Sequence, residues 1–189
     1  MNRTGILWLA AISGAVVCLL FFAVVFHHRA PNLIQNGDFE SGLERWWWYV
    51  DPKSGAKASF TTENVAGASG AALRVSVDQA ADFDNIEISQ GHVPTKAGHN
   101  YTLTFRARST VPQEIEIKVI KNADPWTSYG FLKTATIKTR WQRYKVIGRA
   151  AMTADDGKFM FHFNTPDSSS PIRLGFLSEN PMPSGLLCV

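Results

Sequence analysis

The sequence predicts an all-β protein, a jelly-roll β-sandwich of two antiparallel sheets preceded by one transmembrane or signal-anchor helix. After Pro31, apolar and polar residues alternate with a period of two, and no segment carries a 3.6-residue apolar stripe. Turn residues separate the alternating segments at short spacing, as in sandwiches and jelly rolls. Ahead of them, the 21 residues from Ile6 to Phe26 contain no charge.

Length and composition are those of one folded module. Of 189 residues, 45% are hydrophobic and 12% aromatic, which disfavours a disordered chain. The 19 Lys and Arg are nearly balanced by 16 Asp and Glu, so no nucleic-acid partner is expected. The densest basic stretch, from Arg140 to Arg149, is interpreted as a solvated strand face rather than a phosphate-binding track.

The apolar run at the start is long enough to cross a bilayer as a helix. No A-x-A-like cleavage site follows it, and Pro31 would follow any cut after Ala30, so we expect an uncleaved anchor rather than a signal peptide. Cys18 follows Val17 and precedes further apolar residues, which disfavours lipidation, and it is too distant from Cys188 to form a disulfide. We therefore expect residues 1–30 to be the anchor, 31–177 the sandwich and 178–189 a tail.

Residues Tyr101–Arg108 show the alternation most clearly, with apolar residues at odd positions and polar residues at even ones. Such a strand packs one face on a core and turns the other to water. The same pattern predicts strands at 73–77, 86–88, 115–119, 131–137, 141–147, 159–163 and 172–176, about ten in all.

Four motifs occur in order along the domain. They are Asn32–Leu43 with Trp46 closely behind, Asn85–Gln90, Ala97–Arg108, and Pro125–Gly130 followed by Thr139–Tyr144. Together they resemble the CenC-like carbohydrate-binding modules of families four and nine. The resemblance implies a non-catalytic domain that binds polysaccharide or oligosaccharide outside the cytoplasm, with Trp46 in the core. It weakens at Ile172–Phe176, where the family has an Asp-containing strand.

Sugar rings stack on exposed aromatic side chains, and their hydroxyls need several polar partners. Trp126 and Tyr129 follow a turn and lie among small polar residues, so they are candidates for stacking, with core packing as the alternative. In an extended Trp46–Tyr49 run the rings alternate in direction, which makes Trp47 either a binding residue or a cap on the sandwich edge.

Polar candidates for the hydroxyls are the outward positions of the resembling strands. These are Asn85, Glu87, Gln90 and Arg106, and the direction of Gln90 depends on whether Gly91 marks a bulge.

Two further features concern metals. Asp38 and Glu40 are candidate ligands of a structural calcium ion, because related modules often hold one near this motif, but the missing C-terminal Asp favours a simple turn network instead. The histidines are scattered along the sequence, so no zinc site or nucleophile–base pair is expected.

Two functions other than non-catalytic sugar binding are alternatives for this sequence, namely catalysis and protein binding. Glu114 and Glu116 share one strand face at a glycosidase-like separation, but any E-x-E strand does so, and we expect no catalysis beyond an accessory role in a glycoside hydrolase system. The stronger rival is an envelope module that binds protein and has lost sugar recognition.

Overall fold

The computed structural model describes residues 31–64, 71–81, 84–163, 172–177 and 185–188. This part of the chain contains eleven strands and no helix. The strands are β1 (Trp47–Val50), β2 (Lys57–Asn64), β3 (Ala71–Gln79), β4 (Ile86–Thr95), β5 (Asn100–Arg108), β6 (Gln113–Lys121), β7 (Ser128–Ile137), β8 (Gln142–Arg149), β9 (Ala154–Phe163), β10 (Ile172–Leu177) and β11 (Gly185–Cys188).

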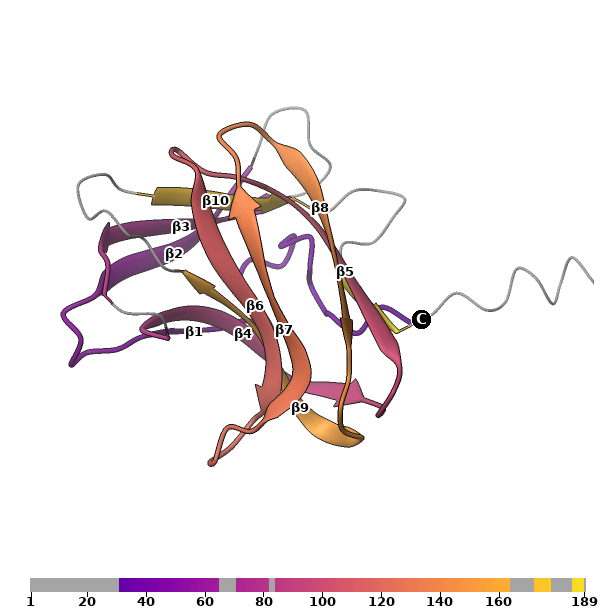
Figure 1. Ribbon diagram of the computed structural model, residues 1–189. Helices are drawn as coiled ribbons and strands as arrows, with labels where there is room; N and C mark the ends of the chain where they lie inside the picture. Colours follow the sequence, from indigo (N-terminus) through magenta and orange to yellow (C-terminus); the bar gives the residue numbers. More distant parts are fainter. Residues whose placement is uncertain (1–30, 65–70, 82–83, 164–171, 178–184, 189) are drawn as a thin grey trace, which may run out of the picture. The chain divides into compact units, whose positions relative to one another are not determined.

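The strands form two antiparallel sheets, as predicted (Figure 1). The five-stranded sheet has the order β1-β4-β9-β6-β7, and the six-stranded sheet has the order β11-β5-β10-β3-β2 with β8 paired to the other edge of β5. Strands distant in sequence are therefore neighbours. In particular, β4, β9 and β6 lie side by side in the middle of the five-stranded sheet.

The core lies between the sheets and follows the predicted alternation. On β6, Ile115, Ile117 and Val119 are buried, while Glu114 on the same strand is exposed. On β5, Leu103 and Phe105 are buried and alternate with threonines. Residues Asn32–Val189 form one compact unit, and the core of the described residues lies wholly inside it, so this unit should fold without residues 1–31.

The opening Asn-Gly-Asp-Phe-Glu motif has a structural role. The side chain of Asn36 donates to the carbonyls of Gly42 and Glu44 and accepts the N–H of Ser41, which closes the loop. Phe39 then stacks on Trp46 with the ring centroids 5.4 Å apart, and the Trp46 indole donates to the Asn36 carbonyl. Trp46 is 6% exposed, which agrees with its predicted place in the core.

The two sheets approach each other closely where β7 meets β8 (Figure 1). A Cβ added at Gly148 of β8 would lie 2.4 Å from the Phe131 ring of β7, a distance that no real contact permits. Glycine is therefore required there because the ring fills the space next to the backbone.

Two predictions concern the ends of the chain, the C-terminal tail and the N-terminal anchor. The segment expected to be a tail contains a strand, β11, which pairs with Tyr101–Thr104 of β5. The expected anchor, residues 1–30, lies outside the described residues, and among those that are described no helix is long and apolar enough to cross a membrane.

The packing of Trp46 yields a prediction. Trp46→Ala should lower the free energy of unfolding by about 3–5 kcal/mol, because it removes a buried ring and leaves a cavity. Trp47→Ala is the matched control, since this neighbouring ring is 73% exposed, and its effect should stay within about 0.5 kcal/mol. Urea unfolding of both variants measures the difference, and equal stabilities would contradict the placement of the two rings.

Candidate functional site

The outward side of the five-stranded sheet carries ionisable groups in its centre. Along β4 and β9 the inward residues are apolar, and the alternate positions place Glu87 and Ser89 of β4 and Met160 and His162 of β9 on the outer side. Although they point outward, Glu87 is 8% exposed and His162 is 2% exposed. We call this side of the sheet the five-stranded face.

Ion pairs, linked through the imidazole of His162, form a continuous chain of polar contacts across the face. Lys158 contacts Glu87, whose second carboxylate oxygen lies 3.3 Å from Nε2 of His162. Nδ1 of His162 lies 2.6 Å from Asp84, and Asp84 is in turn 2.7 Å from the Lys118 ammonium.

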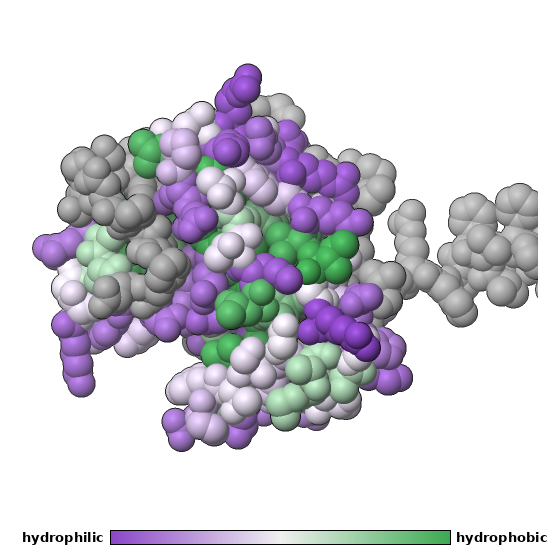
Figure 2. Space-filling view, viewed as in Figure 1, coloured by the Kyte–Doolittle hydropathy of each residue, from purple (hydrophilic) through white to green (hydrophobic). Residues whose placement is uncertain are grey.

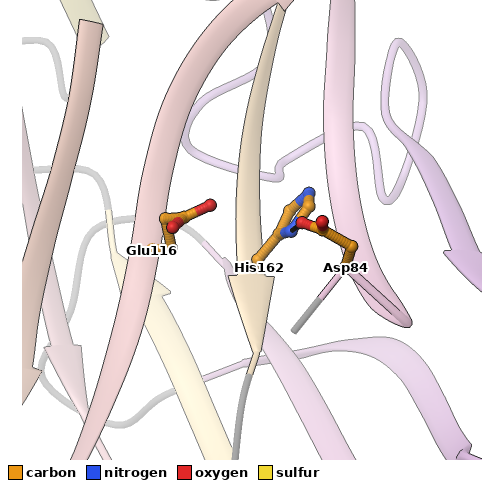
Figure 3. A group of neighbouring side chains, drawn as sticks. All are labelled: Asp84, Glu116 and His162. Carbon is orange, nitrogen blue, oxygen red and sulfur yellow. Dashed lines mark ion pairs between the residues drawn. The ribbon is translucent and has the colours of Figure 1, made fainter. Parts of the chain in front are cut away.

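Glu116 ends this ionic chain, 2.9 Å from Lys118. Figure 3 shows Glu116 and Asp84 on either side of the His162 ring, on separate parts of the fold. Six residues from β4, β6, β9 and the segment before β4 thus form one network: Asp84, Glu87, Glu116, Lys118, Lys158 and His162.

These pairs shift the pKa values of their members. Burial alone would raise the pKa of Glu87, but hydrogen bonds with His162 and Lys158 outweigh burial and lower it below its ordinary value. The same balance lowers the pKa of Asp84, through Lys118 and His162. Burial would lower the pKa of Lys118, but its bonds to Asp84 and Glu116 raise it. The carboxylates and the ammonium are therefore charged at neutral pH.

Asp84, Glu116 and His162 could in principle hold a metal, because their ligand atoms lie within 4.8 Å of one another. The Lys118 ammonium, however, already contacts both carboxylates, at 2.7 Å from Asp84 and 2.9 Å from Glu116. A divalent ion would have to displace it. The group is therefore better described as an ion-pair network than as a metal site.

Exposed aromatic rings flank this network. Trp47 and Tyr49 stand on β1 opposite Ser89 and Glu87, and they are 73% and 47% exposed. Trp126 lies between β6 and β7, and β6 is on the other side of β9 from β4 and β1. The Trp126 ring lies 5.5 Å from the Lys158 ammonium in a cation–π contact. Two exposed indoles therefore stand on either side of the polar centre.

Trp126 is held in an unusual backbone conformation. Its φ is +54°, a left-handed value that is rare for a bulky residue and costs about 1 kcal/mol or more. Its N–H donates to the carbonyl of Ala123, which closes the turn. The turn thus keeps a large apolar ring 51% exposed at an energetic cost, as is typical of functional positions.

Tyr129, predicted as its partner, is not exposed beside it. Its side chain is 4% exposed, and its hydroxyl donates to Asp156 at 2.5 Å. That hydrogen bond, with burial and the charge of Asp156, raises the pKa of Tyr129 to about 12. The turn-like sequence before Tyr129 suggested exposure, but β7 turns this ring away from solvent.

The predicted polar residues divide between three places. Asn85 and Glu87 lie on the five-stranded face, since they alternate with inward-pointing Ile86. Gln90 points inward, because the register shifts only after it, and its amide binds the backbone N–H and carbonyl of Gln35 at 2.9 and 2.7 Å. Arg106 lies on β5 in the other sheet, so it cannot join Trp126 in one binding face.

The predicted calcium ligands take part in a turn. The Asp38 carboxylate accepts the N–H of Glu40 at 3.4 Å, the turn network weighed as the alternative. Neither residue belongs to a group of three or more metal-ligating side chains among the residues described. Calcium at Asp38 and Glu40 stays a prediction.

Sequence reasoning missed the ionic network because its members are scattered along the chain. His162 was regarded as isolated, yet strand order brings it beside Glu87 of β4 and Glu116 of β6. One signal was available: Lys158 and His162 share the outward positions of β9, which alternate with Phe159, Phe161 and Phe163.

The pairing predicts a loss of stability in acid. Because the pKa values of Glu87 and Asp84 are lowered by folding, their contribution is present above the ordinary carboxyl range near pH 4 and is lost as the pH falls through the folded values. Glu87→Gln should lower the free energy of unfolding by about 3–5 kcal/mol at pH 7, because it leaves Lys158 without its buried counter-charge. The free energy of unfolding should then fall less steeply as the pH is lowered. Urea unfolding from pH 7 to pH 3 measures both, with exposed Glu114→Gln as the control. An unchanged acid slope in Glu87→Gln would contradict the pairing.

Comparison with known proteins agrees with this architecture. No curated protein sequence matches the chain. Among solved structures, a family 4 carbohydrate-binding module superposes with a TM-score of 0.64 at 18% identity, covering 82% of this chain and 99% of that one. The N-terminal cellulose-binding domain of β-1,4-glucanase C from Cellulomonas fimi superposes with a TM-score of 0.52 at 18% identity, covering 73% and 88%.

A family 61 module in complex with β-1,4-galactotriose superposes with a TM-score of 0.53 at 16% identity, covering 85% of this chain and 99% of that one. At these identities the structures show a shared fold. The sequence profile described as "Carbohydrate binding domain", built for module families 4 and 9, matches residues 31–169 and confirms the resemblance. The chain belongs to this family of carbohydrate-binding domains.

Proposed function

We propose that the domain binds a polysaccharide or oligosaccharide on the five-stranded face, without catalysing its cleavage. The observation that carries the proposal is the pair of exposed indoles, Trp47 and Trp126, on either side of a buried polar centre. The faces of sugar rings stack on such indoles, and their hydroxyls exchange hydrogen bonds with carboxylates, ammonium groups and hydroxyls. Family membership supports sugar as the class of ligand.

The polar centre is suited to hydroxyls because its carboxylates are paired with ammonium groups. Glu87 and Lys158 retain acceptor and donor capacity beyond their own pair, and Ser89 lies beside them with its hydroxyl 3.4 Å from Glu87. Ion pairing also fixes these side chains before a ligand arrives, which lowers the entropic cost of binding.

The paired carboxylates also support a non-catalytic role. Glu116 is held by Lys118. Hydrogen bonds with His162 and Lys158 outweigh burial and lower the pKa of Glu87, which favours its charged form over that of a proton donor. Glu114, the other member of the E-x-E pair, is exposed to solvent. A general acid for glycoside hydrolysis would need the opposite environment, with a raised pKa.

The stacking proposal is tested with the domain 32–189. Trp47→Ala and Trp126→Ala should each weaken binding about tenfold in affinity gels that contain a panel of β-glucan, xylan and galactan, since each removes one stacking platform. Both should leave the melting temperature nearly unchanged. Trp48→Ala is the matched control, because Trp48 lies on the same strand, is 55% exposed and points to the opposite side, against Phe60.

Retention equal to wild type in both indole variants, on a polysaccharide that wild type binds, would contradict the proposed face. Loss of retention in Trp48→Ala alone would move the site to the sandwich edge. Failure of wild type to bind any glycan would favour the envelope protein-interaction module instead.

We further propose that residues 1–30 anchor the domain in a membrane, with the domain outside the cytoplasm. The support is the uncharged run from Ile6 to Phe26. The full chain should sediment with membranes, resist extraction with high salt and carbonate, and dissolve in detergent. Recovery of a soluble form that begins near Pro31 would contradict the anchor.

A further inference from the structure

The outward side of β5 and β8 carries a concentration of cations. Arg106 pairs opposite Arg143, Thr104 opposite Lys145, and Asn100 opposite Arg149. These residues alternate with buried Leu103 and Phe105, so they point away from the core. We call this surface the cationic face, and its members on the strands are Arg106, Arg108, Arg143, Lys145 and Arg149.

This face gives the domain an uneven distribution of charge. Residues 100–108 and 138–149 contain seven of the 19 Lys and Arg, including Lys138 and Arg140 in the turn before β8, and no Asp or Glu. The remaining 12 Lys and Arg are outnumbered by 16 Asp and Glu. A net charge of only +3 thus conceals one strongly positive surface on an otherwise acidic chain.

The arrangement has a cost in stability. Like charges directly opposite each other in an antiparallel pair generally destabilise a sheet, and Arg106 faces Arg143 in this way. Arg143, Lys145 and Arg149 are all exposed along one side of β8. Such a row of one sign creates a positive potential that attracts an anionic partner.

An apolar side chain stands within this row of cations. Ile147 lies between Lys145 and Arg149 on the same side of β8 and is 52% exposed. Figure 2 shows hydrophobic patches set among polar residues on the side of the molecule that carries β7 and β8. Cations interspersed with exposed apolar groups are typical of surfaces that lie against a lipid interface.

We propose that the cationic face binds the anionic headgroups of a lipid bilayer. A sheet face of this kind matches a lipid surface, where each Lys or Arg gains from the negative surface potential and Ile147 can enter the interface. This inference rests on the proposed anchor, which would tether the domain to a membrane.

The arrangement would leave the sugar site accessible. The cationic face belongs to the six-stranded sheet and the proposed sugar face to the five-stranded one. The outer sides of two packed sheets point away from each other. A domain resting on lipid through one sheet would present Trp47 and Trp126 to the space beyond the membrane.

The test uses the domain 32–189, which lacks the anchor, in sedimentation with vesicles. The domain should bind vesicles of phosphatidylcholine and phosphatidylglycerol at 3:1, and should bind phosphatidylcholine alone far more weakly. Binding should fall steeply between about 0.05 and 0.5 M NaCl. Exchanging Arg143, Lys145 and Arg149 together for Gln should weaken binding roughly 100-fold.

The matched control exchanges Arg45, Lys53 and Lys133 for Gln, three exposed cations outside the face, with the same change in net charge. It should bind the anionic vesicles nearly as wild type does, and circular dichroism checks that both variants fold. Equal losses in the two triple variants, or equal binding to both kinds of vesicle, would overturn the proposal. So would binding of a soluble polyanion such as polygalacturonate without binding of vesicles. Retention of both triple variants in the polysaccharide affinity gels is measured in parallel. Unchanged retention there, with no binding of vesicles, would overturn the lipid proposal and leave the sugar proposal standing.

Discussion

Buried charges must be paired, and that constraint organises the centre of the five-stranded sheet. The network of Asp84, Glu87, Glu116, Lys118, Lys158 and His162 can exist only if β4, β9 and β6 keep their register. A shift of one residue would turn the charged side chains of these strands into the core. Glu87 and His162 are nearly inaccessible although they point outward, whereas Asp84, which precedes β4, is exposed. A sheet surface that would ordinarily be solvated is thereby converted into a preorganised polar floor between two indoles.

The outer faces of the two sheets differ in their charges. On the five-stranded sheet, charges of opposite sign are paired with one another, which suits an uncharged, hydroxyl-rich ligand. On β5 and β8 they have one sign, which suits an anionic surface. Because each sheet has an inner face committed to the core, its outer face is free to take a separate role. Under the two proposals, the five-stranded sheet would bind the ligand, and the cationic face of the six-stranded sheet would orient the domain on the membrane.

The sequence predicted the fold well and the site only in part. Alternation identified β5 and β6, whose inward residues are uniformly apolar, but missed β2, an edge strand whose inward positions, Ala58, Phe60 and Thr62, are only half-buried. Trp47 and Glu87 were correctly placed outward by parity. Gln90 and Arg106 could not be placed, because the first depends on a bulge and the second on the sheet to which β5 belongs. His162 found its partners only through strand order, which no local pattern encodes.

The indole N–H signals of the tryptophans in the domain 32–189 test the central claim most directly. Five rings report from different places: Trp46 in the core, Trp48 on the inner side of β1, Trp141 beneath Arg108, and Trp47 and Trp126 around the polar floor. During titration with an oligosaccharide that the domain binds, the signals of Trp47 and Trp126 should shift together along one saturation curve while the other three stay fixed. Shifts confined to Trp48 or Trp141, with Trp47 and Trp126 unmoved, would contradict the account.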